Sequence, residues 1–385
     1  MSTTAVLPDS KKHYEILDGL RGVASVLVIA FHVMETFTGG NRFIQVINHG
    51  YLAVDFFFLL SGFVVAYAYD DRWGKMGQWD FYKRRLIRLQ PMVIMGSLIG
   101  AALFYFQGSA VVFPMIGKTP VWEMLLVMLV GCTLIPLPIS ADIRGWQEMH
   151  PLNGPAWSLF FEYIANILYA LFIRKFSKTL LSIFVILAAI FLVQYLIMGP
   201  QGDVIGGWSL DKTQLHVGFA RLLYPFFAGV LLCRAGKLIH IKGAFTVCSL
   251  MIVAVLAIPR IGGTGHLWMN GVYESVVIVL VFPLIVSIGA GGKIIGGRAI
   301  KICKFLGDIS YPLYITHYPL IYWYTAWVVD NKIQLGGYGL FVGLLLMISS
   351  ITIAWACLKF YDEPVRNWLA KRYLVKKEVV SKVGK

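Results

Sequence analysis

An arginine and a histidine stand eleven positions apart in one apolar stretch of the chain. The stretch YEILDGLRGVASVLVIAFHVMETF begins at Tyr14 and carries Asp18, Arg21 and His32. A charged side chain at a bilayer centre costs about 2.5–3.5 kcal/mol on insertion scales, so such residues face a protein interior or a watery cavity. Helical geometry separates Arg21 from His32 by about 16 Å along the axis with almost no rotation. The two side chains are therefore predicted to share one face of a helix.

A buried imidazole beside a carboxylate is a typical general base, because the carboxylate holds its tautomer and charge. Two carboxylates in other apolar stretches, Asp55 and Glu162, are predicted to lie at the depth of His32. Counting from the outer end of each span, the depths are about 6 Å, 10 Å and 8 Å respectively. His32 would then be the base, with Glu162 or Asp55 as its orienting partner. The alternative is that His32 only hydrogen-bonds across helices, and Asp55 is as readily structural as functional.

A basic motif, FYKRRLIRLQP, marks the cytoplasmic start of a later span and contains Arg84, Arg85 and Arg88. Guanidinium groups match phosphate oxygens in pairs, so this cluster together with Arg21 predicts a phosphate site. Two simpler readings remain open. Juxtamembrane basic residues commonly anchor a span on the cytoplasmic side, and Arg21 at i+3 from Asp18 is placed for a simple ion pair.

Further polar side chains gather in the apolar stretch FLGDISYPLYITHYPLIYW, which contains Tyr311, Tyr314 and His317. Its two prolines predict a bent helix of the kind that lines a cavity. Trp157 and Ser158 precede Glu162 on another span. We count these five and Asp18 as candidate substrate-binding residues. The alternatives are a packing role for His317 and an interfacial anchor role for Trp157.

These residues must be positioned by membrane-spanning helices, because 58% of the 385 residues are hydrophobic and only 14% are charged. Such a composition excludes a soluble globule. We predict an all-α bundle, since each span needs about 20 apolar residues. Ten spans are expected, at 15–37, 51–70, 86–107, 155–173, 179–199, 215–234, 243–259, 271–290, 305–328 and 337–359.

The distribution of lysine and arginine predicts the orientation of the spans, since short cytoplasmic loops are enriched in both. The basic clusters place both termini in the cytoplasm, which requires an even number of crossings. The apolar segment 121–138 is then best interpreted as a re-entrant or interfacial helix. We expect one membrane-embedded domain over 1–385, with cytoplasmic tails at 1–13 and 367–385.

Some partners are disfavoured by the sequence. The formal charge of +14 is mostly the cytoplasmic bias of the loops, so nucleic acid is not an expected partner. The five cysteines lack Cys-x-x-Cys or Cys/His spacing, so neither a disulfide framework nor a metal site is predicted.

Six motifs in order give the chain a resemblance to the acyltransferase-3 family of integral membrane acyltransferases. They are LDGLRGVASVLVIAFH (17–32), DFFFLLSGF (55–63), FYKRRLIRLQP (81–91), WSLFFE (157–162), LGDISYPLYITHYPL (306–320) and YDEPVR (361–366). Arg21 and His32 match the family's arginine followed by ten residues and a histidine. Arg84, Arg85 and Arg88 match its arginine motif, and Glu162 matches its acidic residue.

The resemblance implies transfer of an acetyl or other acyl group from cytoplasmic acetyl-CoA to a hydroxyl of a cell-surface or lipid-linked glycan. His32 would be the general base or a transient acyl carrier, and Tyr311, Tyr314 and His317 are candidate donors to the oxyanion. We expect a multi-pass protein of the bacterial cytoplasmic membrane. Any second transfer step would need a separate extracytoplasmic transferase. Competing hypotheses are a flippase for a lipid-linked sugar and a structural subunit of an envelope complex.

Overall fold

The computed structural model describes residues 13–294 and 296–374, and within these ranges the chain is helical without any β-strand. The predicted all-α bundle is therefore confirmed. The predicted tails are 1–13 and 367–385, and of these, residues 1–12 and 375–385 lie outside the described residues. The helices are α1 (Glu15–Thr36), α2 (Ala53–Tyr69), α3 (Gln78–Leu103), α4 (Val121–Gly131), α5 (Ala156–Leu171), α6 (Lys178–Met198), α7 (Lys212–Ala235), α8 (Ala244–Ala257), α9 (Leu267–Val276), α10 (Phe282–Gly291), α11 (Gly297–Thr316), α12 (Tyr318–Asp330), α13 (Gly337–Cys357) and α14 (Glu363–Tyr373).

In the part of the chain that is described, eight helical segments are long and apolar enough to cross a membrane. They correspond to α1, α2, α3, α5, α6, α7, the continuous pair α9–α10 and the continuous pair α13–α14. A π-helical turn joins the two helices of each pair, at Val277–Val281 and at Leu358–Asp362. The chain is therefore an integral membrane protein.

Two of the predicted spans are not single long helices, and a third apolar segment was expected not to cross. The predicted span 243–259 is α8, whose 14 residues are about 21 Å long and fall short of a 30 Å hydrocarbon core. The span 305–328 is two helices, α11 and α12, which meet at His317 with a proline inside the first and another at the start of the second. The predicted bend is thus confirmed. Segment 121–138 contains only the 11-residue α4, too short to cross, as expected.

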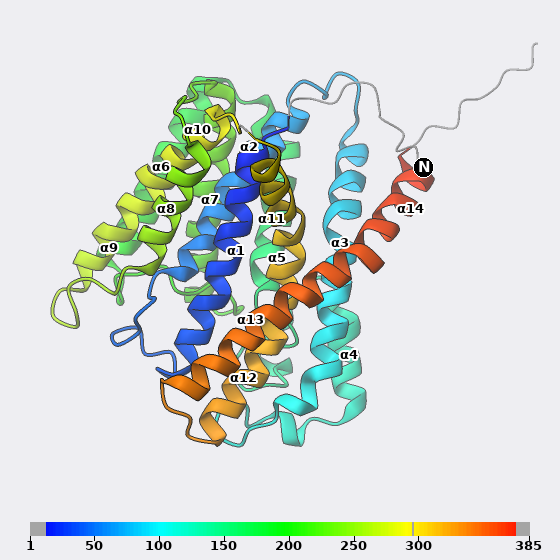
Figure 1. The fold of residues 1–385 in the computed structure, drawn as a ribbon. Coiled ribbons are helices and arrows are strands. Elements are labelled where there is room, and N and C mark those ends of the chain that lie inside the picture. The colour runs from blue at the N-terminus through cyan, green and yellow to red at the C-terminus, as the bar shows by residue number, and fades with distance from the viewer. Residues whose placement is uncertain (1–12, 295, 375–385) are drawn as a thin grey trace, which may run out of the picture.

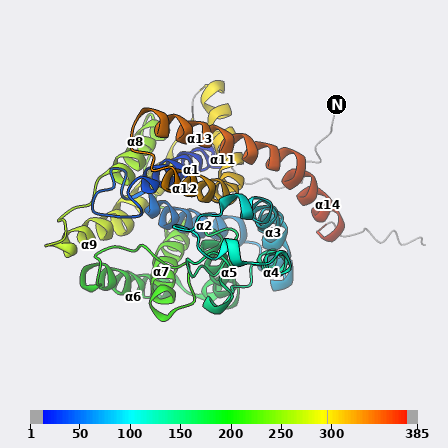
Figure 2. The same ribbon diagram turned by 90° about the horizontal axis from the view of Figure 1, so that it is seen from below.

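Helix α1 is the central element of the bundle. It packs against α2, α8, α10, α11, α12 and α13. Figure 1 shows its course through the bundle, and Figure 2 shows it between α13 and α2. The α1–α11 contact is close because Gly22 faces the backbone of Leu306 and Gly307 faces Asp18, with no room for a Cβ atom at either glycine. Small residues allow helices to approach in this way. Buried side chains extend along α1 from Ile16 to Thr36, so both ends of this helix face the interior of the bundle.

The α2–α7 contact is equally close. A Cβ at Gly62 would collide with the carbonyl of Phe226, and one at Gly229 would collide with the carbonyl of Leu59. This approach also brings together two buried charges, because Asp55 on α2 accepts hydrogen bonds from Arg221 on α7 at 2.7–3.2 Å. Helices α13 and α14 run obliquely across the bundle (Figure 1).

Candidate active site

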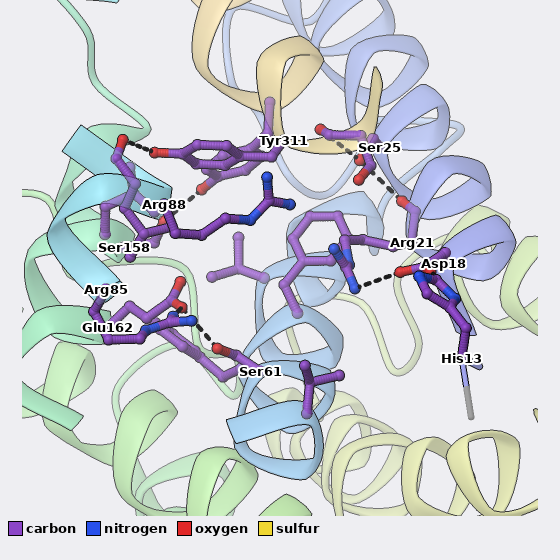
Figure 3. A pocket seen from close by; sticks show the side chains of 18 residues that line it. His13, Asp18, Arg21, Ser25, Ser61, Arg85, Arg88, Ser158, Glu162 and Tyr311 are labelled. Carbon is purple, nitrogen blue, oxygen red and sulfur yellow. Dashed lines mark hydrogen bonds and ion pairs between the residues drawn. The ribbon is translucent and has the colours of Figure 1, made fainter. Parts of the chain in front are cut away.

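A cavity of about 300 Å³ opens among α1, α2, α3, α5 and α11 and contains most of the predicted arginines. We call it the arginine cavity (Figure 3). Its polar lining residues are His13, Asp18, Arg21, Ser25, Ser61, Arg85, Arg88, Ser158, Glu162, Ser310, Tyr311 and Tyr314. Helix α3 begins at Gln78, eight residues before the predicted span, so Arg85 and Arg88 lie two to three turns inside the helix. Both arginines therefore lie within the helix and line the cavity, and neither stands at the helix end.

Two of the three lining arginines are already paired with carboxylates. Arg21 donates to Asp18 at 2.9 Å, and Arg85 donates to Glu162 at 2.6 Å. Among the described residues, no hydrogen bond or ion pair joins the guanidinium of Arg88, whose side chain extends into the cavity (Figure 3). The charge of Asp362 acts on Arg88 from nearby without an ion pair between them. A cation that no carboxylate contacts directly is the stronger site for an added anion. Arg84 does not line the cavity.

A second cavity, of about 710 Å³, surrounds the other end of α1. We call it the histidine cavity. Its wall is mostly apolar and rich in aromatic residues, namely Phe31, Tyr51, Trp146, Trp157, Trp208, Tyr314, Tyr318 and Tyr322. Its ionisable residues besides these tyrosines are His32, Glu35, Arg42, Glu148 and Arg221. Aromatic walls with few convergent polar groups are typical of sites for organic ligands.

His32 is held by a carboxylate one helical turn along its own helix. Its Nδ1 lies 2.8 Å from Oε2 of Glu35. A carboxylate only accepts, so Nδ1 carries the proton and Nε2 is left with a lone pair, as a general base requires. The ring also packs edge-on against Tyr318, with centroids 4.8 Å apart.

The predicted pairing of His32 with Asp55 or Glu162 is wrong, because both carboxylates are bound by other residues. Asp55 is bound by Arg221, and Glu162 lies in the arginine cavity, where Ser61 donates to it at 2.7 Å alongside Arg85. Sequence reasoning missed two residues here: Glu35, which holds His32, and Arg221, which holds Asp55. Both left signals: Glu35 stands at i+3 from His32, and Arg221 in an apolar span needs a buried counter-ion.

The two cavities are neighbours with a shared wall, because Val54 and Tyr314 line both of them. The first turn of α5 also contributes to both walls, with Trp157 in the histidine cavity and Ser158 in the arginine cavity. The hydroxyls of Ser158 and Tyr314 lie 2.7 Å apart and share the hydrogen bonds at this junction. A thin wall of side chains thus lies between the space around the arginines and the space around His32.

Two of the candidate oxyanion donors are otherwise engaged. The Tyr311 hydroxyl donates to the carbonyl of Leu89 at 2.6 Å. His317 is fully buried, and its Nδ1 lies 2.9–3.0 Å from two carbonyl oxygens, so it carries the ring proton. Its Nε2 has no partner among the described residues and offers only a lone pair. The neutral His317 ring, 5.7 Å from His32 between centroids, therefore stands beside the base without a proton to donate toward it.

The fold and this pair of cavities define a membrane-embedded helical bundle with a basic site and a histidine site that share a wall inside it. The sequence model of the acyltransferase-3 family, described as an acyltransferase domain, matches residues 14–359. The chain belongs to this family, and the resemblance predicted from the motifs is confirmed.

Several curated proteins are similar to the chain. Protein 2 in the picA locus of Rhizobium radiobacter is 32% identical over 173 residues, which are 41% of this chain and 82% of that protein. O-acetyltransferase OatA of Staphylococcus aureus is 23% identical over 93% of this chain and 58% of its own length. Acyltransferase MdmB of Streptomyces mycarofaciens is 29% identical over 42% of this chain and 40% of its own length. The chain thus spans little more than half of OatA. No solved structure matches.

Proposed function

We propose that the chain transfers an acetyl group from acetyl-CoA, bound in the arginine cavity, to a hydroxyl of a cell-surface or lipid-linked glycan bound in the histidine cavity. The observation that carries this proposal is the junction at Val54 and Tyr314, the two residues that line both cavities. The chain's family supports acyl transfer, and its similarity to an O-acetyltransferase supports an oxygen acceptor.

The arginine cavity is the proposed donor site and faces the cytoplasm. Arg88 binds a CoA phosphate first because no carboxylate hydrogen-bonds to it, while Arg85 and Arg21 contribute after partial release from Glu162 and Asp18. The pantetheine arm extends past Tyr314 and brings the thioester to His32. The glycan enters the histidine cavity from the opposite side of the membrane.

His32 performs the chemistry in this proposal. Its Nε2 takes the proton of the acceptor hydroxyl, and the oxygen attacks the thioester carbonyl to form a tetrahedral oxyanion. The carbon–sulfur bond then breaks, and the CoA thiolate recovers the proton from His32. Glu35 keeps the proton on Nδ1 throughout. In the alternative route, Nε2 itself attacks the thioester and CoA leaves as the thiolate. The hydroxyl then attacks acetyl-His32, and its proton passes to the thiolate as the imidazole is released.

A direct test uses radiolabelled acetyl-CoA and membranes that contain the protein. We expect label in envelope glycan with the wild-type protein and a rate about 10²–10⁴-fold lower with His32→Ala. His216→Ala is the control, since His216 packs on Phe191 and lines neither cavity. Equal labelling with both variants, or no labelled glycan with wild type, contradicts the proposal. Movement of a sugar lipid across vesicles without label transfer would identify a flippase instead.

A further inference from the structure

The segment between α4 and α5 covers the histidine cavity and brings one carboxyl group into its wall. This group is Glu148, which lines the cavity with Trp146 and is only 5% exposed. Backbone hydrogen bonds fasten the segment nearby: Met149 donates to the carbonyl of Trp208 at 2.7 Å. A carboxyl group buried in an aromatic wall is costly unless it is hydrogen-bonded or binds something.

One oxygen of Glu148 is fully committed. The Tyr322 hydroxyl donates to Oε2 at 2.5 Å and itself accepts from the backbone N–H of Gly154 at 3.2 Å. Arg144 lies over the Tyr322 ring, 3.6 Å from its centroid, and donates to the carbonyl of Pro151 at 2.8 Å. The carboxyl group is therefore held in one orientation by a chain of fixed contacts.

The other oxygen, Oε1, makes no hydrogen bond to another described residue. Room for it exists because residue 154 is glycine: a Cβ there would lie 2.7 Å from both Oε1 and the Tyr322 hydroxyl. Polar groups buried in this way usually have a partner, and an oxygen on a cavity wall is one that a ligand can satisfy.

We propose that Glu148 is the acceptor-binding residue of the histidine cavity, where Oε1 accepts a hydrogen bond from one hydroxyl of a pyranose ring. The ring's apolar C–H faces would stack among Trp146, Trp157 and Trp208, and a neighbouring hydroxyl would then point to His32. This inference rests on the proposed function, since it names the residue that selects and orients the acceptor of that reaction.

The charge state of Glu148 makes the binding pH-dependent. Burial raises the pKa of Glu148 to about 7, while Arg144 and the Tyr322 hydrogen bond act in the opposite sense. Above that pH, Oε1 is a charged acceptor for a hydroxyl; below it, the neutral acid accepts more weakly because the charge is lost. The ionisable groups around Glu148 and across the cavity are Asp142, Arg144, Tyr318, Tyr322, His32, Glu35, Arg42, Tyr51, Arg221 and Tyr314.

The test measures binding without catalysis, by tryptophan fluorescence of the protein in lipid nanodiscs. The probes are methyl glycosides of glucose, galactose, mannose and N-acetylglucosamine. We expect Glu148→Gln, which presents an N–H₂ group in place of Oε1, to weaken binding about tenfold at pH 8. From pH 6 to pH 8 the wild-type affinity should rise several-fold while that of Glu148→Gln stays flat.

Glu123→Gln is the matched control, because Glu123 stands on α4 and lines neither cavity. Tyr322→Phe, which frees Oε2 but keeps the ring, should weaken binding less than Glu148→Gln. Equal affinities of wild type and Glu148→Gln, parallel pH profiles, or no binding of any glycoside overturn the inference. Acetyl transfer by wild type with unchanged Glu148→Gln affinity would refute the inference alone, whereas no transfer by wild type would refute the proposed function.

Discussion

The two cavities of this protein share two lining residues, but the rest of their lining residues differ in chemical type. The arginine cavity is walled by charges that mostly neutralise one another, as in Arg85 with Glu162. The histidine cavity is larger and mainly aromatic, and its base is held by Glu35. One wall suits an anion and the other suits a ring with apolar faces. The contrast fits the proposal that two chemically unlike substrates approach a single histidine, and each prediction below tests one side of it.

The largest effect after loss of His32 is expected at Arg88. Arg88→Ala should raise the KM for acetyl-CoA about 10–100-fold, because a charge-assisted hydrogen bond to a phosphate is lost, with kcat and acceptor KM little changed. Steady-state kinetics with varied donor measure this. Arg84→Ala is the matched control, since Arg84 lies outside the cavity lining. A larger effect at Arg84 than at Arg88 would place the phosphates elsewhere.

The junction is tested by Val54→Phe. The larger ring should narrow the space that Val54 and Tyr314 share, and we expect acetyl transfer to fall about tenfold or more because the thioester is misplaced. Donor and acceptor affinities should stay near wild type, as measured separately by titration. Val54→Ile, which adds a single methylene, is the control. Undiminished transfer with Val54→Phe would argue that acyl groups do not pass this point.

The pair that holds the base is tested by Glu35→Gln. Glutamine keeps the shape but not the charge, so the proton on Nδ1 of His32 is held less firmly, and kcat should fall about tenfold. The effect is smaller than that of losing His32, since the Glu35 side chain is one-third exposed. Donor KM should not move. A change confined to donor KM would contradict this prediction, because it would mean that Glu35 acts on the donor and not on His32.

The smallest effect is expected at Gly154. Gly154→Ala would push a methyl group against Oε1 of Glu148 and the Tyr322 hydroxyl, and the flexible carboxyl end must then shift. We expect acceptor KM to rise about two- to fivefold with donor KM unchanged, the reverse of Arg88→Ala. An equal rise in both constants would mean that the substitution disturbs the bundle as a whole.

Much of this site was predictable from local spacing. Helix periodicity placed Arg21 and His32 on one face of α1, and their cavities do share a wall. The i+3 rule that pairs Asp18 with Arg21 would also have paired His32 with Glu35.

Depth and long-range pairing were less predictable. Counting Glu162 from the outer end of its span placed it beside His32, whereas its carboxylate lies with Arg85 in the arginine cavity, because α5 starts at Ala156 behind a buried loop. The Asp55–Arg221 pair joins positions 166 residues apart, and no local pattern indicates that α2 lies against α7.

The junction at Val54 and Tyr314 also bears on the membrane as an electrical barrier. A transporter that moved a whole nucleotide or sugar would have to open a wide path and close it again in every cycle. In the mechanism proposed for this chain a thin pantetheine arm reaches past Tyr314, and only its two-carbon acetyl unit stays on the far side. A passage no wider than that arm is filled by it during each transfer, so the reaction offers ions no open route and leaves the proton gradient intact.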